Sequence, residues 1–309
     1  MLKIYFKTTK NRRLAKIKKV TGGSWVNISE AAQEDLEEVV KLTDLTLLDL
    51  RDTLDIQELP RIERHRYSLM IFVRIPTERM DNSSFIHTTP LTCIITDKYF
   101  ITISPVKNHI LKDIQKSSLP IATTQRSKLL VYLLLKISQS FTSQVKLISH
   151  QVASKKKRIE NIKDSDIGEL IKYEDILNQY TSALIPMRNV FENLVEAGYL
   201  KFYQEDQELF DDAVISMRQS VDICQVNLKS IKSLRESYQI VFTNRLNKVI
   251  QFLTAFTIIM TIPTIIASLY GMNVSLPMAG NPFAFVYVLL ISLGIIILFF
   301  ILFYKKRWL

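Results

Sequence analysis

The stretch that decides the fold is residues 249–273, VIQFLTAFTIIMTIPTIIASLYGMN. Its first part, Val249 to Tyr270, carries no charged residue. As a helix with a rise of about 1.5 Å per residue, it is long enough to cross the roughly 30 Å hydrocarbon core of a bilayer. A second uncharged run, Ala284 to Tyr304, has the same property. We therefore predict two transmembrane helices rather than two buried helices of a soluble core.

The orientation of these helices follows from the basic residues around them. Three basic residues follow the second run and two precede the first, whereas the connecting loop, residues 271–283, has none. The positive-inside rule then places both flanks in the cytoplasm. We expect a multi-pass protein of the plasma (inner) membrane with both termini cytoplasmic. The basic residues are Arg245, Lys248, Lys305, Lys306 and Arg307.

The composition of the chain excludes several classes of protein. The chain has a net charge of +10 and 48% hydrophobic residues, which argues against intrinsic disorder. Its two cysteines exclude a disulfide scaffold. The basic charges are spread out and favour membrane lipid rather than nucleic acid as a partner. The four histidines are scattered and no catalytic or metal-binding spacing is present, so we expect neither an enzyme nor an organic cofactor.

Residues 1–120 have the pattern of a cytoplasmic α/β domain. Apolar runs with strand-like composition alternate with turn residues, and the last two runs form a predicted hairpin around Asp97-Lys98. Ser29 is predicted to cap a helix from Glu30 to Lys41, because acids occupy its first turns. A further helix is expected over 45–54. The predicted strands are Leu2–Phe6, Ser24–Ile28, Tyr67–Ile75, Leu91–Thr96 and Tyr99–Ile103.

The remainder of the chain is predicted to be helical. Residues 121–204 read as a cytoplasmic helical hairpin region, which Gly198 interrupts. Residues 205–270 read as one stalk helix, on the order of 100 Å long, that continues into the first membrane span. A helix of that length must pack laterally against other helices. An outer loop (271–283), a second span (284–304) and a basic tail (305–309) complete the organisation.

One face of the first span is polar, at alternating steps of three and four residues. Small hydroxyl side chains let membrane helices approach closely, or they line a wet path. If the face lines a path, two spans cannot enclose it, so several identical chains must surround an axis. Toward the cytoplasm the same face reaches Glu236, whose acid would form a charged ring at a cation entrance. This polar stripe comprises Asn247, Ile250, Thr254, Thr257, Thr261, Thr264 and Ser268.

The span ends in Tyr270-Gly271-Met272-Asn273, where Gly271 suits a helix stop with positive φ. Asn273 offers a neutral amide oxygen at the outer end of the polar stripe. At these residues the chain resembles the CorA family of divalent-cation channels, whose hallmark is Gly-Met-Asn at this place. The resemblance covers essentially the whole chain. Pro186-Met187-Arg188 and the stretch from Asp52 to Glu63 also look like family features.

The resemblance implies a funnel-shaped homopentamer, with the first span lining the pore and the second facing lipid. It assigns Asn273 to a ring that holds hydrated Mg²⁺ through its water shell, with Gly271 and Met272 shaping the selectivity filter. Mg²⁺ dehydrates reluctantly, so a neutral amide that contacts its waters suits it. Ile250 and Leu253 would form an apolar constriction. The family's pore rings fall on Asn247, Ile250, Leu253, Thr257, Thr261 and Thr264.

The resemblance also implies regulation by cytoplasmic Mg²⁺ held between subunits. It places one regulatory acid at Asp212 and its partner near Glu78; the other interpretation is that both are solvated surface acids. Mg²⁺ that bridges subunits would favour the closed state. One departure from the family is the outer loop, which holds no acid here and leaves the identity of the ion open.

The expected function is a passive magnesium-selective channel that takes up hydrated Mg²⁺ down the membrane potential and is gated by cytoplasmic Mg²⁺. The alternative is a Co²⁺/Ni²⁺ or Zn²⁺ transporter of the same superfamily, with or without proton coupling. Softer ions usually call for His or Cys ligands. The spans and the outer loop contain neither, which favours Mg²⁺. A structural membrane scaffold would not explain the polar stripe.

Overall fold

The fold consists of an N-terminal α/β domain, a long helix and two apolar C-terminal helices, as predicted. The computed structural model describes residues 2–11, 13–77, 87–116, 121–156, 164–196, 198–199, 204–273, 281–306 and 308. The chain has two compact units, Met1–Ser233 and Leu234–Leu309. The α/β domain and a helical bundle make up the first unit, and the two apolar helical segments make up the second.

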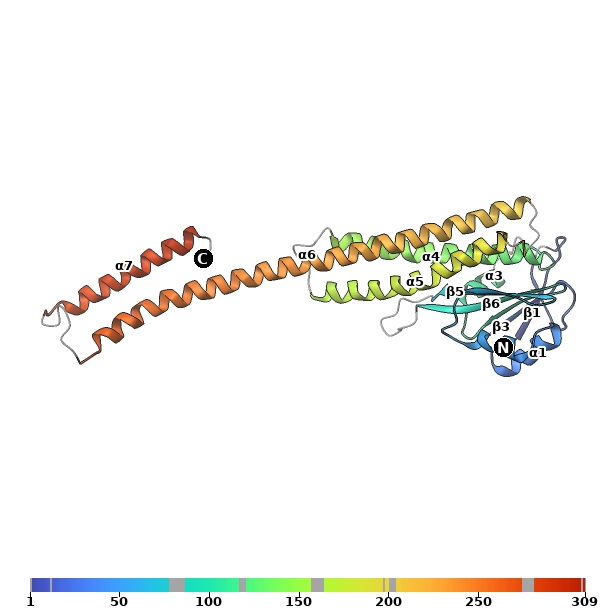
Figure 1. Cartoon of the computed structure of the whole chain (residues 1–309), viewed down its shortest axis with the longest axis horizontal. Helices are drawn as coiled ribbons and strands as arrows, with labels where there is room; N and C mark the ends of the chain where they lie inside the picture. The colour runs from blue at the N-terminus through green and yellow to red at the C-terminus, as the bar shows by residue number, and fades with distance from the viewer. Residues whose placement is uncertain are drawn as a thin grey trace. The chain divides into compact units, whose positions relative to one another are not determined.

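A seven-stranded mixed sheet organises the first unit, in the order β2-β1-β3-β7-β6-β5-β4 (Figure 1). All neighbouring strands are antiparallel except β3 and β7, which run parallel with Trp25 opposite Phe100. The strands are β1 (Leu2–Phe6), β2 (Ala15–Ile17), β3 (Trp25–Ser29), β4 (Arg61–Arg64), β5 (Ser68–Pro76), β6 (Thr88–Thr96) and β7 (Phe100–Ser104).

Most of this sheet follows from the sequence pattern. The five predicted strands are present, and the hairpin between β6 and β7 is confirmed, with Ile94 opposite Ile101. Two strands of the sheet, β2 and β4, were not predicted from the sequence. Strand β2 has only three residues and β4 reads RIER, so neither carries the alternation of apolar residues that marks a strand.

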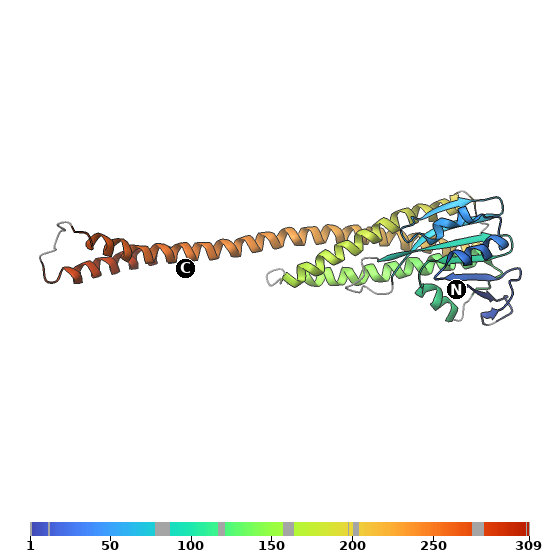
Figure 2. The same cartoon turned by 90° about the horizontal axis from the view of Figure 1, so that it is seen from below.

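Helices cover both faces of the sheet (Figures 1 and 2). On one face lie α1 (Gln33–Leu42), α2 (Leu47–Leu50) and the 3₁₀ helix η1 (Arg51–Leu54). Leu36 and Val39 of α1 pack there into a core with apolar residues of the central strands. Strand β5 is buried along its whole length, because helices α4 and α5 contact it from the other face.

The predicted start of α1 is wrong. Ser29 is the last residue of β3, and Glu30 adopts a positive φ of 53°. The helix begins at Gln33, three residues later than predicted. The Asp35 carboxylate accepts a hydrogen bond from the Ala32 N–H at 3.1 Å. An acid in the first turn thus stabilises the helix start in place of a serine cap. The helix predicted over 45–54 is divided into α2 and η1.

Three long helices form a bundle above the sheet: α4 (Arg126–Lys156), α5 (Asp164–Glu196) and the first part of α6 (Gln204–Tyr270). Gly198 follows α5 with a positive φ of 61°, as expected for a helix break. Phe141 packs edge-on against Tyr180 with ring centroids 5.2 Å apart. The side that α6 buries in the bundle repeats at steps of three and four residues, as in a coiled coil. Its members are Phe210, Ala213, Met217, Ser220, Cys224, Asn227, Ile231 and Leu234.

The long helix is continuous from Gln204 to Tyr270, which confirms the prediction of a single helix. Beyond Leu234 its character changes, since no residue from 235 to 250 is buried in the single chain. In the second unit, α7 (Ala284–Lys305) returns beside the last part of α6 (Figures 1 and 2).

Replacing Phe141 by Ala is expected to destabilise the bundle, because Phe141 is fully buried. Removing a core phenylalanine costs about 3–5 kcal/mol, so the melting temperature of the detergent-purified protein should fall by several degrees. Lys146→Ala, at an exposed site on the same helix, is the matched control and should change stability by about 0.5 kcal/mol or less. Equal melting temperatures for the two variants would contradict the bundle packing.

Candidate functional site: a polar stripe on helix α6

Both segments of the second unit are long and apolar enough to cross a membrane. In a soluble protein such helices would be covered by the rest of the fold. Here almost all side chains of their most apolar stretches are exposed in the single chain. Exposed apolar surface of this extent calls for hydrocarbon or other chains around it.

The polar stripe is exposed along its whole length. Its four threonine hydroxyls satisfy themselves within the helix, because each donates a hydrogen bond to the backbone carbonyl four residues earlier. This use of the hydroxyl proton is common for threonine in helices. The O···O distances are 2.8 Å for Thr254, 2.8 Å for Thr257, 2.7 Å for Thr261 and 3.0 Å for Thr264.

These bonds determine what the polar stripe offers to its surroundings. A hydroxyl has one proton and two lone pairs. With the proton engaged, each threonine presents oxygen lone pairs outward. Such oxygens accept hydrogen bonds from water, including the water shell of a cation. The polar stripe is therefore suited to a wet, cation-carrying surface and carries no charge of its own.

The polar stripe lies on the side of α6 opposite to its intrachain packing. Ala255, in the apolar segment of α6, is fully buried in the single chain. Thr257 and Thr261 follow it by two and six residues, which turns them about 200° and 240° around the helix axis. On α7, Ser292 and Phe303 are buried in turn. The side of α6 that carries Ala255 is therefore not the side that carries the polar stripe.

At the outer end, α6 closes without a left-handed glycine. The predicted positive φ at Gly271 is wrong, since positive-φ glycines among the described residues are Gly23 and Gly198. Gly271 matters for another reason: a Cβ there would lie 3.3 Å from the Ala267 carbonyl oxygen, tighter than ordinary contact. Its N–H instead donates to that carbonyl at 2.9 Å. Met272 and Asn273 follow as exposed residues.

Before the first apolar span, the same face of α6 carries Glu236, which is exposed. It lines a shallow hollow with Gln239, Ile240, Thr243 and Asn244. Of the two predicted regulatory acids, Asp212 is exposed on α6, and Glu78 lies outside the described residues. Within the ranges that the structure describes, no three His, Cys, Asp or Glu side chains gather as a metal site.

The chain is similar to known proteins along most of its length. The family model described as "CorA-like Mg2+ transporter protein" matches residues 21–306. A curated relative from Methanocaldococcus jannaschii, "Cobalt/magnesium transport protein CorA", is 25% identical over 292 residues, covering 92% of this chain and 90% of the relative.

Two solved structures share the fold. The complete structure of the CorA magnesium transporter from Methanocaldococcus jannaschii superimposes with a TM-score of 0.84 at 22% identity, and the match covers 100% of this chain and 99% of that one. The full-length CmaX protein gives a TM-score of 0.73 at 16% identity, with coverage of 99% and 97%. The arrangement of the α/β domain, the long helix and the two apolar helices is therefore shared along the whole chain.

Proposed function

This chain belongs to the CorA-like Mg²⁺ transporter family, and from that premise we propose that it is a passive, magnesium-selective channel. As a family member it is a membrane transporter of divalent cations. The proposal goes further: copies of α6 surround a common axis, their polar stripes face that axis, and hydrated Mg²⁺ moves along it. It also includes the expected orientation, with both termini in the cytoplasm.

The observation that carries the proposal is the position of the polar stripe. The threonines of the stripe are exposed in the single chain and are turned away from the buried side chain of Ala255. Facing lipid tails, the outward oxygen lone pairs of the threonines and the amide of Asn247 would find no hydrogen-bond partner, which is costly. Placing them around a water-filled axis removes that cost, and symmetry makes one stripe per chain sufficient.

Assembly of several copies is supported by the exposed middle of α6. From residue 235 to 250 the helix has no buried residue in the single chain, and its apolar side chains Ile240, Phe242 and Leu246 are half-exposed or more. An isolated helical segment of this kind is marginal in water. Other copies of α6 would cover it and supply the missing lateral contacts. We take the number of copies to be five, as the family resemblance implies.

The ring of Asn273 residues is the proposed selectivity filter. Mg²⁺ holds its water molecules strongly, and a neutral amide oxygen can accept hydrogen bonds from those waters without removing them. Below the filter, the threonine lone pairs would continue the same contact with the hydrated ion. The driving force is the membrane potential, which supplies roughly 4.6 kcal/mol to a divalent ion per 100 mV.

Gating is assigned to the cytoplasmic half of the stripe. Ile250 and Leu253 are exposed apolar residues near its inner end and would form a constriction that closes by losing water. Mg²⁺ bound at Asp212 and Glu78 of neighbouring copies would stabilise the closed state, because it would offset repulsion between their carboxylates. Loss of this Mg²⁺ would favour opening. The acid of Glu236 would attract cations at the inner mouth.

Transport of Co²⁺ is the second candidate, because the curated relative from Methanocaldococcus jannaschii carries cobalt as well as magnesium in its name. The chemistry of the stripe argues for the harder ion. Its amide and hydroxyl oxygens suit Mg²⁺, whereas Co²⁺, Ni²⁺ and Zn²⁺ bind more strongly to imidazole and thiolate ligands.

Ion selectivity is tested by uptake into proteoliposomes that contain the full-length protein. Mg²⁺ uptake should rise with an interior-negative potential and should not change when a proton gradient is added. Co²⁺, Ni²⁺ and Zn²⁺ are assayed in parallel under the same potential. Uptake that requires the proton gradient, or Zn²⁺ uptake that exceeds Mg²⁺ uptake, would establish the alternative transporter in place of the proposed channel.

Replacing Asn273 by Ala should lower Mg²⁺ uptake to near background, because the filter loses the oxygens that accept hydrogen bonds from the ion's waters. Asn281→Ala is the matched control. It removes the same amide from the other end of the outer loop, where Asn281 accepts a hydrogen bond from the Phe283 N–H at 3.0 Å. Gel filtration should show the same assembly for both variants. Full uptake by a correctly assembled Asn273→Ala variant would refute the filter role.

The assignment of the stripe to the conducting side is tested at Thr264, about two and a half helical turns before Asn273. Thr264→Leu should slow Mg²⁺ uptake by about tenfold or more, since it replaces an outward oxygen by a bulkier apolar group on the proposed pore wall. Ile265→Leu, which conserves volume at the exposed neighbouring residue, should leave uptake almost unchanged. Similar losses in both variants would argue against the assigned face.

A further inference from the structure

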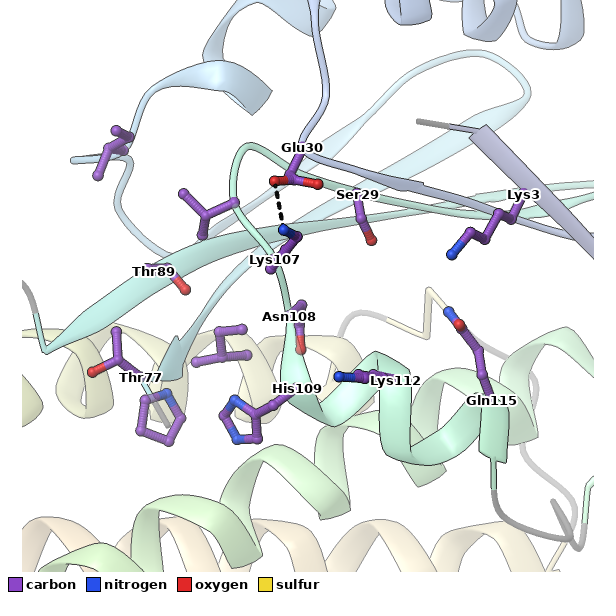
Figure 3. A pocket seen from close by; sticks show the side chains of 14 residues that line it. Lys3, Ser29, Glu30, Thr77, Thr89, Lys107, Asn108, His109, Lys112 and Gln115 are labelled. Carbon is purple, nitrogen blue, oxygen red and sulfur yellow. Dashed lines mark ion pairs between the residues drawn. The ribbon is translucent and has the colours of Figure 1, made fainter. Parts of the chain in front are cut away.

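A cavity of about 620 Å³ lies in the first unit, between the sheet and the start of α3 (His109–Lys116) (Figure 3). It is far along the chain from every residue of the polar stripe. On the sheet side it is bounded by Lys3 of β1, Ser29 at the end of β3, and Thr89 of β6. Nothing in the proposed transport path uses this cavity.

The topology places the cavity where α/β folds commonly bind anions. Strands β3 and β7 are the parallel pair of the sheet, and the chain leaves the carboxyl end of β7 to enter α3. Ligands of α/β sheets bind beyond the carboxyl ends of parallel strands. There the N-terminus of the following helix contributes partial positive charge and N–H groups.

The strongest indication that the cavity is a binding site is Asn108, which immediately precedes α3. The residue is only 5% exposed, and its side-chain oxygen accepts a hydrogen bond from the Leu111 N–H at 3.1 Å. Asn108 is also one of the residues that line the cavity. Its amide nitrogen has no hydrogen-bond partner. Leaving a buried donor unsatisfied costs about 1–3 kcal/mol, and a ligand with acceptor oxygens would remove that cost.

The charge of the lining is positive. Lys107 is paired with Glu30 at 3.4 Å. Two further lysines, Lys3 and Lys112, line the cavity, and neither forms an ion pair with any residue in the described part of the chain. Figure 3 shows Lys3 directed from the sheet toward α3 and Lys112 directed from α3 into the same space.

From these features we propose that the cavity binds a soluble small molecule that carries a phosphate group. Phosphate oxygens would accept hydrogen bonds from the amide of Asn108 and pair with Lys3 and Lys112 at the start of α3. The hydroxyls of Ser29 and Thr89 border the same space. This site does not rest on the proposed transport function, since its evidence lies wholly in the first unit.

The remaining wall indicates that the ligand is larger than phosphate alone. Ile56, Ile75, Pro76 and Val106 provide an apolar side to the cavity. A volume of this size is typical of sites for small organic ligands. A nucleotide has the required combination, because its phosphate would meet the lysines and its base would lie on the apolar side. ADP is therefore the probe of choice, with inorganic phosphate and adenosine as its two parts.

The test is isothermal titration calorimetry on the full-length protein in detergent, at constant ionic strength with EDTA present. ADP should bind more tightly than inorganic phosphate or adenosine. Asn108→Asp keeps an oxygen for the Leu111 N–H but removes the donor, and Lys112→Gln removes a positive charge at an exposed site. Each should weaken ADP binding by about tenfold or more, as loss of a charge-assisted hydrogen bond implies.

Lys16→Gln is the control, since Lys16 is an exposed lysine of β2 that does not line the cavity. It should change the affinity by about twofold at most. Absence of saturable ADP and phosphate binding at concentrations on the order of 10 mM, or equal ADP affinity in the wild type, Asn108→Asp and Lys112→Gln, would overturn the proposal. Because Lys112 is exposed, the Lys112→Gln variant should fold normally, so a change in its ADP affinity reports on binding and not on misfolding.

Discussion

The interaction on which the second unit depends is the hydrogen bond from each threonine hydroxyl to the carbonyl one turn earlier in α6. Within a bilayer there is no water to satisfy a polar group from the side. The bond occupies the hydroxyl proton inside the helix and leaves only oxygen lone pairs outside. The outer surface of the helix thereby becomes a row of acceptors. A row of acceptors is what a hydrated dication, whose waters donate outward, requires along its route.

The same helix connects two chemically different environments. Up to Leu234, α6 buries a regular apolar side against α4 and α5. Beyond it the helix is largely exposed, and Ala255 is the fully buried residue of its apolar segment. In the proposed assembly, the same continuous helix is part of the bundle core and part of the pore wall, so it would transmit movement of the bundle directly to the pore. In that assembly, a change in the contacts between the helical bundles of neighbouring copies would move Ile250 and Leu253.

The first unit has its own polar centre, which is independent of the membrane segments. A parallel strand pair in an otherwise antiparallel sheet directs β7 into α3, and this connection brings Lys3, Asn108 and Lys112 to one cavity. In the proposal, a phosphate compound binds in this cavity, so the state of the α/β domain would depend on the concentration of that compound.

The sequence by itself determined the two spans, the long helix, the five main strands and the polar stripe. Each of these follows from a local pattern in the sequence. A long uncharged run predicts a membrane span, alternation of apolar and polar residues predicts a strand, and apolar or polar residues at steps of three and four predict one face of a helix. Strand β2, strand β4 and the start of α1 depended on tertiary structure, because their residues pair with or pack on distant partners. The same holds for the cavity at Asn108. These involve residues remote in sequence, and only the closed sheet and the packed helices bring them together.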